Sequence, residues 1–237
     1  MPVSISCISW NWGAWESRGS LRASQYCGQE LLHLLFVKET KISTKRVESL
    51  QHTLGFTGCY DVTSVGLSGG IRLFWSKEVD VEPKNFSSGH IDVMVRSKDH
   101  ASREWRFTGF YKSPRVEDRY HSWRFLRTLH ALSHFAWLCM GDFNETLYAT
   151  EYFSNSARPE WQMRAFREVI DDFSFQDLGW LGLPYTRDNR HGRYSNAKAR
   201  LDRAFANEEF VQLFEHVRVR HVCGSESYHY FIVAHIN

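Results

Sequence analysis

Short apolar runs that stop abruptly at polar residues constrain the fold of this chain more than any other feature of its sequence. Residues 31–37 form one such run, which stops at Lys38, and residues 136–140 form another, which stops at Gly141 and Asp142. Runs of this length are typical of strands buried on both sides, and they are far too short to cross a bilayer. A sheet made of such strands has to be covered on both faces.

The remaining segments alternate between helix and strand patterns. Apolar residues recur at helical spacing in residues 44–54, which are followed by Gly55, in residues 117–133, and from Pro159 to Phe173. Further strands are predicted at residues 4–10, 71–75, 90–96, 105–111, 200–205 and 230–233. We therefore predict an α/β fold in which two mixed β-sheets pack as a sandwich with helices on the outer faces, a four-layer α-β-β-α arrangement.

Composition and cysteine content bound the class of protein. Hydrophobic residues make up 43% of the chain and charged residues 24%, which is ordinary for a globular domain. The five cysteines are scattered without a C-x-x-C pair, which predicts reduced thiols in an intracellular protein. The sequence shows neither a signal-peptide pattern nor an internal repeat. We expect residues 1–237 to form one soluble domain, with no membrane attachment and no small organic cofactor.

Polar side chains stand at the ends of the predicted strands, where α/β folds place their sites. Asn11 follows the first strand, Glu39 the second, Asp142 and Asn144 a third, and His229 precedes the last. Each of these residues alone is more often a turn former, a cap or a core histidine. Together they offer oxygen ligands of the kind that Mg²⁺ or Mn²⁺ prefers, and a histidine that, with a carboxylate nearby, can deprotonate the attacking water.

A basic segment extends from Arg187 to Arg203. It contains six Lys or Arg residues and two Asp residues, a net charge of +4, whereas the whole chain carries only +2. Such a segment is either a solvated loop or a strip that tracks the phosphates of a nucleic acid. The candidate phosphate contacts are Arg187, Arg190, Arg193, Lys198 and Arg200.

The order of short motifs resembles the endonuclease/exonuclease/phosphatase superfamily, and most closely the endonuclease domain of plant LINE-type (non-LTR) retrotransposons. The motifs extend over nearly the whole chain in the order that the family shows. They are SWN at residues 9–11, KET at 38–40, SGGI at 68–71, WRFTGFY at 105–111, GDFNE at 141–145, RPEWQMRAFRE at 158–168, RLDRAFAN at 200–207 and SYH at 227–229.

The resemblance implies a nuclease that uses a divalent metal. Asn11 and Glu39 would hold Mg²⁺ or Mn²⁺, with Glu39 as the direct carboxylate ligand. Tyr111 would contact the scissile phosphate and stabilise its developing charge. DNA would be the substrate and partner, and the nucleus the expected location.

The same resemblance implies roles for four residues around the phosphate. Asp142 would position or activate the attacking water, and Asn144 would hydrogen-bond a phosphate oxygen. Asp202 would hold the ring of His229, which would contact the phosphate or polarise the nucleophile. A metal, a positioned water and a His–Asp pair are sufficient for phosphodiester hydrolysis.

Two positions depart from the family pattern. The family's final motif is Ser-Asp-His, whereas this chain has Tyr228 immediately before His229. A phenol, with an ordinary pKa near 10, carries no negative charge at neutral pH, and it is bulkier than a carboxylate. Gly13 also comes one position earlier after Asn11 than the family pattern has it. These departures predict weak or absent nicking by this chain.

Three functions remain open from the sequence. The first is a metal-dependent endonuclease, and the second is a catalytically inactive module that keeps the fold and binds nucleic acid or another partner. The third is a phosphatase of small phosphoesters, against which the retrotransposon-type motifs count. Purely structural roles also remain open for single residues: Tyr111 as a packing residue of its strand, His229 as a core imidazole, and Asp202 as a partner of Arg200 or Arg203.

Overall fold

Two large β-sheets packed face to face form the centre of the molecule in the computed structural model. The structure describes residues 4–11, 32–40, 44–63, 70–98, 104–111, 119–131, 135–189, 196–223 and 229–237. In spatial order, the larger sheet contains β11 (Leu181–Gly182), β15 (Val217–Val222), β16 (Phe231–Ile236), β1 (Ile5–Asn11), β2 (Leu34–Thr40), β4 (Gly70–Trp75) and β3 (Gly58–Val62). The second contains β10 (Gln176–Asp177), β14 (Asp202–Ala206), β8 (Trp137–Asp142), β7 (Glu104–Tyr111), β6 (His90–Ser97) and β5 (Val79–Ser87).

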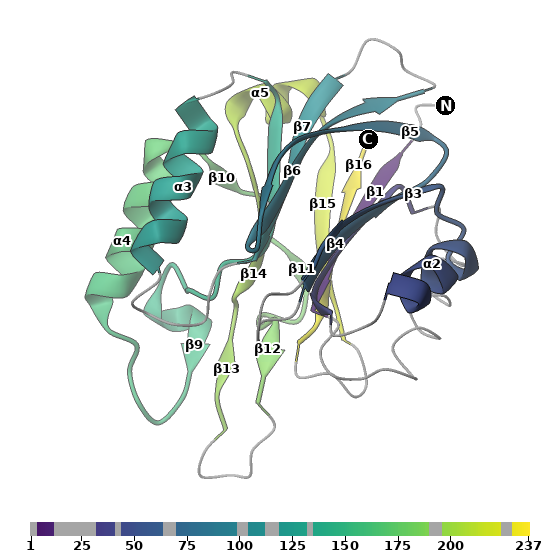
Figure 1. Ribbon diagram of the computed structural model, residues 1–237. Coiled ribbons are helices and arrows are strands. Elements are labelled where there is room, and N and C mark those ends of the chain that lie inside the picture. Colours follow the sequence, from purple (N-terminus) through teal and green to yellow (C-terminus); the bar gives the residue numbers. More distant parts are fainter. Residues whose placement is uncertain are drawn as a thin grey trace.

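Both sheets are mixed. The pairs β1–β2 and β7–β8 are parallel, while β1–β16, β2–β4 and β8–β14 are antiparallel. A small third sheet of β12 (Arg187–Asp188), β13 (Lys198–Ala199) and β9 (Tyr152–Phe153) stands below them in Figure 1. The short helix η1 (Ala149–Glu151) connects β8 to β9 of the third sheet, and α5 (Glu208–Leu213) connects β14 of the second sheet to β15 of the larger sheet.

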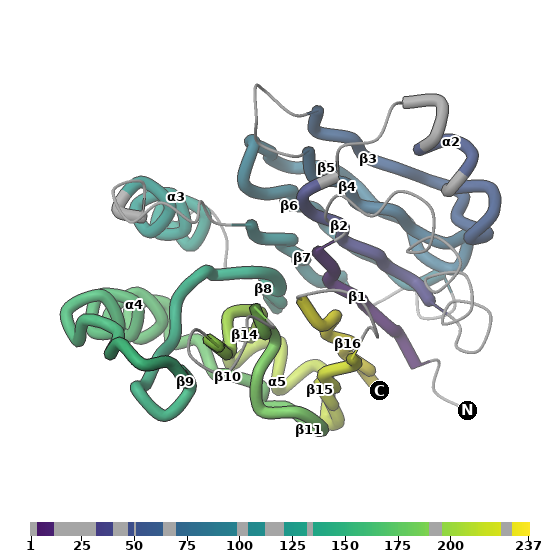
Figure 2. The backbone as a smooth tube through the Cα atoms, turned by 90° about the horizontal axis from the view of Figure 1, so that it is seen from below, coloured from purple at the N-terminus to yellow at the C-terminus, as the bar shows by residue number. Residues whose placement is uncertain are grey.

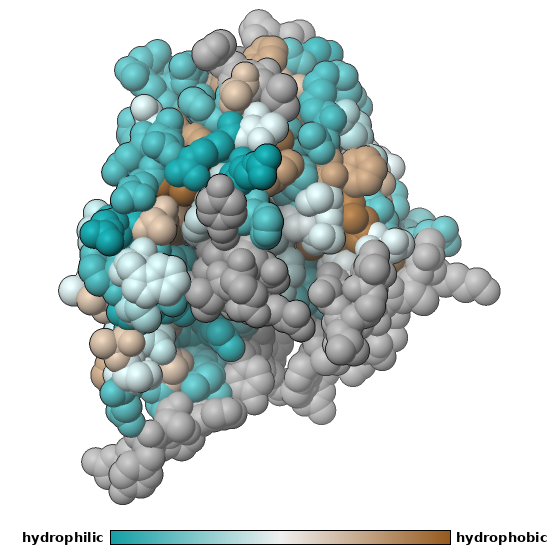
Figure 3. All heavy atoms as spheres, turned by 60° about the vertical axis from the view of Figure 1, so that its left-hand side comes forward, coloured by the Kyte–Doolittle hydropathy of each residue, from teal (hydrophilic) through white to brown (hydrophobic). Residues whose placement is uncertain are grey.

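Helices cover the outer faces of the two sheets, as Figure 1 shows. The helix α2 (Thr44–Thr53) lies on the larger sheet, and α3 (Arg119–Ala131) with α4 (Glu160–Asp172) lies on the second sheet. The outward surface on the side of α3 and α4 is mainly hydrophilic (Figure 3). The predicted four-layer α-β-β-α fold is confirmed. No helix in the described part of the chain has the length and apolar character that crossing a bilayer requires.

Three apolar clusters separate these layers. The central cluster fills the space between the sheets, with Phe36 from β2 and Phe107 from β7 fully buried. The second packs α3 and α4 on β8 around Phe166. The third lies on the outer face of the larger sheet, where Trp10 packs with Val47 of α2. Burial on both faces explains why the strand sequences read as continuous apolar runs.

The strands extend further than the apolar runs predict. The strand β2 includes Lys38, Glu39 and Thr40, and β8 continues through Gly141 and Asp142. The sequence predicts that these strands stop at the first polar residue, which is wrong because strand pairing continues and the polar side chains find buried partners. The strands β3, β5 and β15 also went unpredicted, although β15 shows the alternation VRVRHV.

His90, the first residue of β6, supplies a prediction about acid stability. Its ring is 1% exposed and lies 3.9 Å from the ring of Phe125, measured between centroids. Burial lowers the pKa of His90 to about 4, and the charge of Arg106 acts in the same direction. Since an unfolded histidine has a pKa near 6.5, the stability contributed by neutral His90 is complete above pH 6.5 and is lost as the pH falls toward 4.

We expect His90→Gln to lose less stability than the parent chain between pH 7 and pH 4. The difference should be roughly 3 kcal/mol in the free energy of unfolding, measured by urea denaturation. His52→Gln, which changes an exposed histidine of α2, should follow the parent. Parallel pH profiles for His90→Gln and the parent would show that His90 does not cause the acid sensitivity.

Candidate active site

Side chains from both sheets meet at one end of the sandwich, at the carboxyl ends of β1, β2, β7 and β8. In register, Asn11 of β1 pairs with Lys38 of β2, and Tyr111 of β7 pairs with Asp142 of β8, which pairs in turn with Asp202 of β14. Figure 2 looks at this end of the molecule and shows these strands grouped at its centre. Residues that are far apart in the sequence therefore lie side by side.

A bulge in β2 allows two consecutive side chains to reach the second sheet. The pairing of β2 with β4 shifts register between Val37 and Thr40, and Glu39 has a backbone φ of 57°. In a regular strand, Lys38 and Glu39 would point to opposite faces. Here the Lys38 ammonium contacts Asp202, and Glu39 Oε1 accepts a hydrogen bond of 2.6 Å from the Tyr111 hydroxyl. Unusual backbone conformations of this kind concentrate at functional sites.

Lys38 places a positive charge among the buried carboxylates. Its side chain is completely buried and forms an ion pair with Asp202, and its Nζ lies 4.0 Å from Asp142 Oδ2. In the sequence Lys38 is the polar residue at which an apolar run stops and the first letter of the KET motif, and neither pattern predicts this role. The ammonium partly neutralises two carboxylates that would otherwise repel each other.

Asp202 also pairs with His229, as the resemblance implies. His229 Nδ1 lies 3.5 Å from Asp202 Oδ2, and one atom each of Asp142, Asp202 and His229 can lie within 4.8 Å of the other two. Thr186 Oγ1 accepts the backbone N–H of Asp202 at 2.9 Å, and the carbonyl of Thr186 accepts the N–H of Tyr230 at 2.8 Å. Thr186 therefore holds the backbone at Asp202 and at the residue that follows His229, a role that no sequence motif indicates.

The loop after β8 is held by its own polar groups. The backbone N–H of Asn144 donates to Asp142 Oδ1 at 2.9 Å, and Asn144 has a φ of 49°. Arg158, ahead of α4, donates to the Asn144 carbonyl and to Glu145 Oε1. Gly141 is required because a Cβ there would lie 1.8 Å from the carbonyl oxygen of Phe110. These contacts explain why GDFNE and the arginine of RPEW occur together.

The carboxylates differ in their electrostatic environment. Burial, the largest influence, raises the pKa of Asp142 above its ordinary value; Lys38 opposes this effect and Asp202 adds to it. Burial acts in the same direction on Asp202, but Lys38 and His229 outweigh it and hold the pKa of that carboxyl well below its usual range. Burial, with Glu39 nearby, raises the pKa of Tyr111, which stays a neutral phenol. Asp142 is thus the better proton acceptor of the two aspartates.

The donor set fits a hard divalent cation. Asn11 and Glu39 offer an amide and a carboxylate oxygen at the ends of adjacent strands, and Asp142, Asp202 and His229 supply further ligand atoms nearby. Oxygen-rich sets of this kind suit Mg²⁺ or Mn²⁺ rather than a thiolate-bound metal. The Lys38 ammonium already compensates part of the charge on the aspartate side, so Glu39 is the carboxylate that the Lys38 ion pair leaves for a metal.

The basic segment divides into surface and buried charges. Arg187 is exposed and pairs through its backbone with His229, and Lys198 is partly exposed and lies 3.2 Å from Asp188. Arg190 and Arg193 lie outside the described residues. Arg200 is only 2% exposed and pairs with Asp177 and Glu151, as Arg203 does. The expectation that Arg200 tracks phosphates is therefore wrong, because its guanidinium is buried and paired with two carboxylates.

The pairing pattern counts against Asp202 as a structural partner of Arg200 or Arg203. Arg200 and Arg203 share Asp177 and Glu151 with each other, whereas Asp202 faces Lys38 and His229. Ser227, Tyr228 and Gly13 lie outside the described residues, so both departures from the family pattern stay at the level of sequence.

A model of the endonuclease/exonuclease/phosphatase family matches residues 15–224 of the sequence. The chain belongs to this family. The match extends through the KET, GDFNE and RLDR segments, which carry most of the residues described above. No curated protein matches the sequence itself.

Solved structures agree with this family in fold. The endonuclease domain of TRAS1, a telomere-specific non-LTR retrotransposon, has a TM-score of 0.71 at 14% identity, with 99% of each chain covered. The AP endonuclease of Leishmania major has a TM-score of 0.71 at 11% identity, covering 99% of this chain and 88% of the other. The catalytic domain of human nocturnin has a TM-score of 0.69 at 14% identity, covering 99% and 93%.

Proposed function

We propose that this family member is a divalent-metal-dependent phosphodiesterase that cleaves DNA as an endonuclease. The observation that carries the proposal is the contact chain across the two sheets, from Glu39 to Tyr111 on one side and from Lys38 to Asp202 and His229 on the other. A structural role alone does not require two consecutive polar residues of one strand to face the same way. DNA as substrate and the nucleus as location rest on the resemblance to retrotransposon endonucleases.

The proposed chemistry assigns each side chain one task. Asp142, with its raised pKa, accepts a proton from the attacking water. Asn144 and His229 donate hydrogen bonds to phosphate oxygens, and Asp202 holds the imidazole of His229 in position. Tyr111 contacts the phosphate, with Glu39 as its partner in the absence of substrate. When bound to Asn11 and Glu39, Mg²⁺ or Mn²⁺ supplies positive charge that stabilises the transition state.

The experiment that separates this function from that of a phosphatase compares two substrates. Supercoiled plasmid and p-nitrophenyl phosphate are incubated with the protein in Mg²⁺, in Mn²⁺ and in chelator. The proposal predicts weak, metal-dependent nicking of the plasmid and no release of nitrophenol. Hydrolysis of the small phosphomonoester without plasmid nicking would replace the proposal by the phosphatase function.

A non-cleaving nucleic-acid module is the second candidate. Two observations favour it: Tyr228 stands where the family has an aspartate, and the Lys38 ammonium already pairs with Asp202. Binding of plasmid without nicking under all metal conditions would favour this second function. The two candidates share the same DNA-binding surface and differ only in turnover.

Arg187 offers a test of DNA binding beside the site. Its guanidinium is exposed, and its charge acts on the pKa of Tyr111. We expect Arg187→Gln to weaken binding to duplexes of unrelated sequence to a similar degree and to lower the salt dependence of log K by about one. The measurement is fluorescence anisotropy at several salt concentrations in chelator. Arg164→Gln, on the exposed side of α4, should leave the salt dependence unchanged, and an unchanged value for Arg187→Gln would contradict the prediction.

A further inference from the structure

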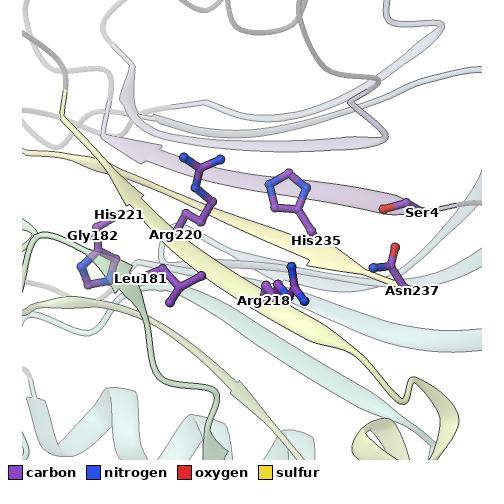
Figure 4. Close-up of a pocket in the computed structure, with 8 residues that line it drawn as sticks. All are labelled: Ser4, Leu181, Gly182, Arg218, Arg220, His221, His235 and Asn237. Carbon is purple, nitrogen blue, oxygen red and sulfur yellow. The ribbon is translucent and has the colours of Figure 1, made fainter.

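A second concave surface lies along β11, β15 and β16 of the larger sheet, outside the candidate active site. Its volume is about 620 Å³, and it is lined by Arg218 and Arg220 of β15, His235 of β16, Leu181 of β11 and Ser4 ahead of β1. Figure 4 shows these side chains along one stretch of the sheet. This surface extends along β15 and β16, from Ser4 and Asn237, where β1 begins and β16 ends, to His221, which pairs with Ile232 near the start of β16. We call it the second basic surface.

Its charged side chains are arginines. The two arginines are exposed, and no side-chain ion pair among the described residues holds either guanidinium. No carboxylate side chain belongs to the described residues that line it. His221, at the inner edge, has a pKa lowered mainly by burial, so at neutral pH the fixed charges are those of the two arginines.

The spacing of these groups suits a row of anions. Arg218 and Arg220 are two residues apart on one strand, so they project from the same face about 7 Å apart. Arg218 lies directly opposite His235 in register, and His235 lies opposite Ser6, whose Oγ is 3.1 Å from His235 Nδ1. Ser6 thereby fixes the orientation of the ring, and the histidine extends the row of polar groups across three strands.

The open shape of the surface favours a chain of phosphates over a single ion as its ligand. A site for one phosphate would have donors that converge on one enclosed point, whereas both guanidiniums here are exposed and separated along a strand. Leu181, which is 55% exposed, and Trp180, which is 39% exposed, add apolar area at the rim next to the charges. Charge with adjacent apolar area is the combination that nucleic-acid backbones and sugars require.

We infer that the second basic surface binds the phosphodiester backbone of a nucleic acid away from the cleavage site. This inference rests on the proposed function only in the choice of a polynucleotide as the ligand. The contacts are sequence-independent because guanidiniums here would meet phosphates rather than base edges. His235 follows His229 by six positions, which corresponds to about 20 Å at the rise of a strand. One nucleic acid can therefore reach both surfaces, since a turn of B-DNA extends about 34 Å.

The test measures binding without cleavage. A short fluorescent DNA duplex is titrated in chelator at several KCl concentrations with the parent and with the double variant Arg218→Gln/Arg220→Gln. The loss of two phosphate contacts should lower the slope of log K against log salt by about 1.8. The matched control is Arg124→Gln/Arg164→Gln, which removes the same charge from exposed positions of α3 and α4 and should keep the parent's slope.

Three outcomes would overturn the inference. The first is an equal slope for both double variants and the parent. The second is that the double variant Arg218→Gln/Arg220→Gln loses binding to phosphatidylserine vesicles while its DNA binding is unchanged, which would identify a lipid-facing surface. The third is saturation by inorganic phosphate without any effect on the DNA slope. This binding assay does not measure cleavage. If the chain fails to nick plasmid while Arg218→Gln/Arg220→Gln lowers the slope, the proposed nuclease is contradicted and the second basic surface is still supported.

Discussion

Lys38→Met lowers the free energy of unfolding by about 3–5 kcal/mol if the buried ammonium stabilises the site as the structure indicates. The ammonium pairs with Asp202 and lies 4.0 Å from Asp142, and all three side chains are buried. Methionine keeps most of the volume but removes the charge. Asp142 and Asp202, which are cross-strand partners, then repel each other in a medium of low polarity, and one of them has to take up a proton.

Urea denaturation of the parent and of two lysine variants measures this effect. Lys98→Met is the matched control, because Lys98 forms a pair with Asp80 at 3.2 Å in which both side chains are about half exposed. Exposed pairs of this kind contribute at most about 1 kcal/mol, so the control should stay close to the parent. A loss for Lys38→Met no larger than that of the control would show that Lys38 is not a necessary counter-charge.

Tyr228→Asp should raise the rate of plasmid nicking by roughly a hundred- to ten-thousand-fold, because one positioned catalytic group is typically worth that much. The reason is the family pattern Ser-Asp-His, in which the aspartate precedes the histidine that corresponds to His229. The parent chain lacks this carboxylate and is expected to nick weakly or not at all. Recovery is measured as the rate of conversion of supercoiled to open-circular plasmid in Mg²⁺.

Tyr228→Asn is the control for size, since it has the shape of aspartate without the charge. It should recover much less activity than Tyr228→Asp if charge is what the site lacks. Equal recovery by both variants would assign the defect to the bulk of the tyrosine. Robust nicking by the parent chain would show that the site tolerates Tyr228, and the prediction would then be wrong.

The sequence was sufficient for the architecture, for physical reasons. A run such as residues 34–37 has no polar face, so it can only lie between two covering layers, and two such runs with helices between them require a layered fold. Patterns of this kind can be recognised in a linear sequence.

The contacts inside the site could not be predicted in the same way. Lys38 looked like the first polar residue beyond a buried strand, whereas the bulge at Glu39 continues the strand and turns both side chains toward the second sheet. Thr186 carries no motif, and its hydrogen bonds to the backbone around Asp202 depend on the tertiary fold. Arg200 looked like part of a basic surface strip because a charge pattern does not show which guanidiniums are buried.

The most direct test of the central claim is the plasmid-nicking rate of Tyr228→Asp with and without Glu39→Ala. The account predicts nicking in Mg²⁺ or Mn²⁺ that stops in chelator and falls at least about a hundredfold when Glu39 is replaced, with folding and DNA binding retained. Asp142→Ala should abolish the same gain. Nicking that persists in chelator or survives Glu39→Ala would contradict the assignment of this cluster as a metal-dependent phosphodiesterase site.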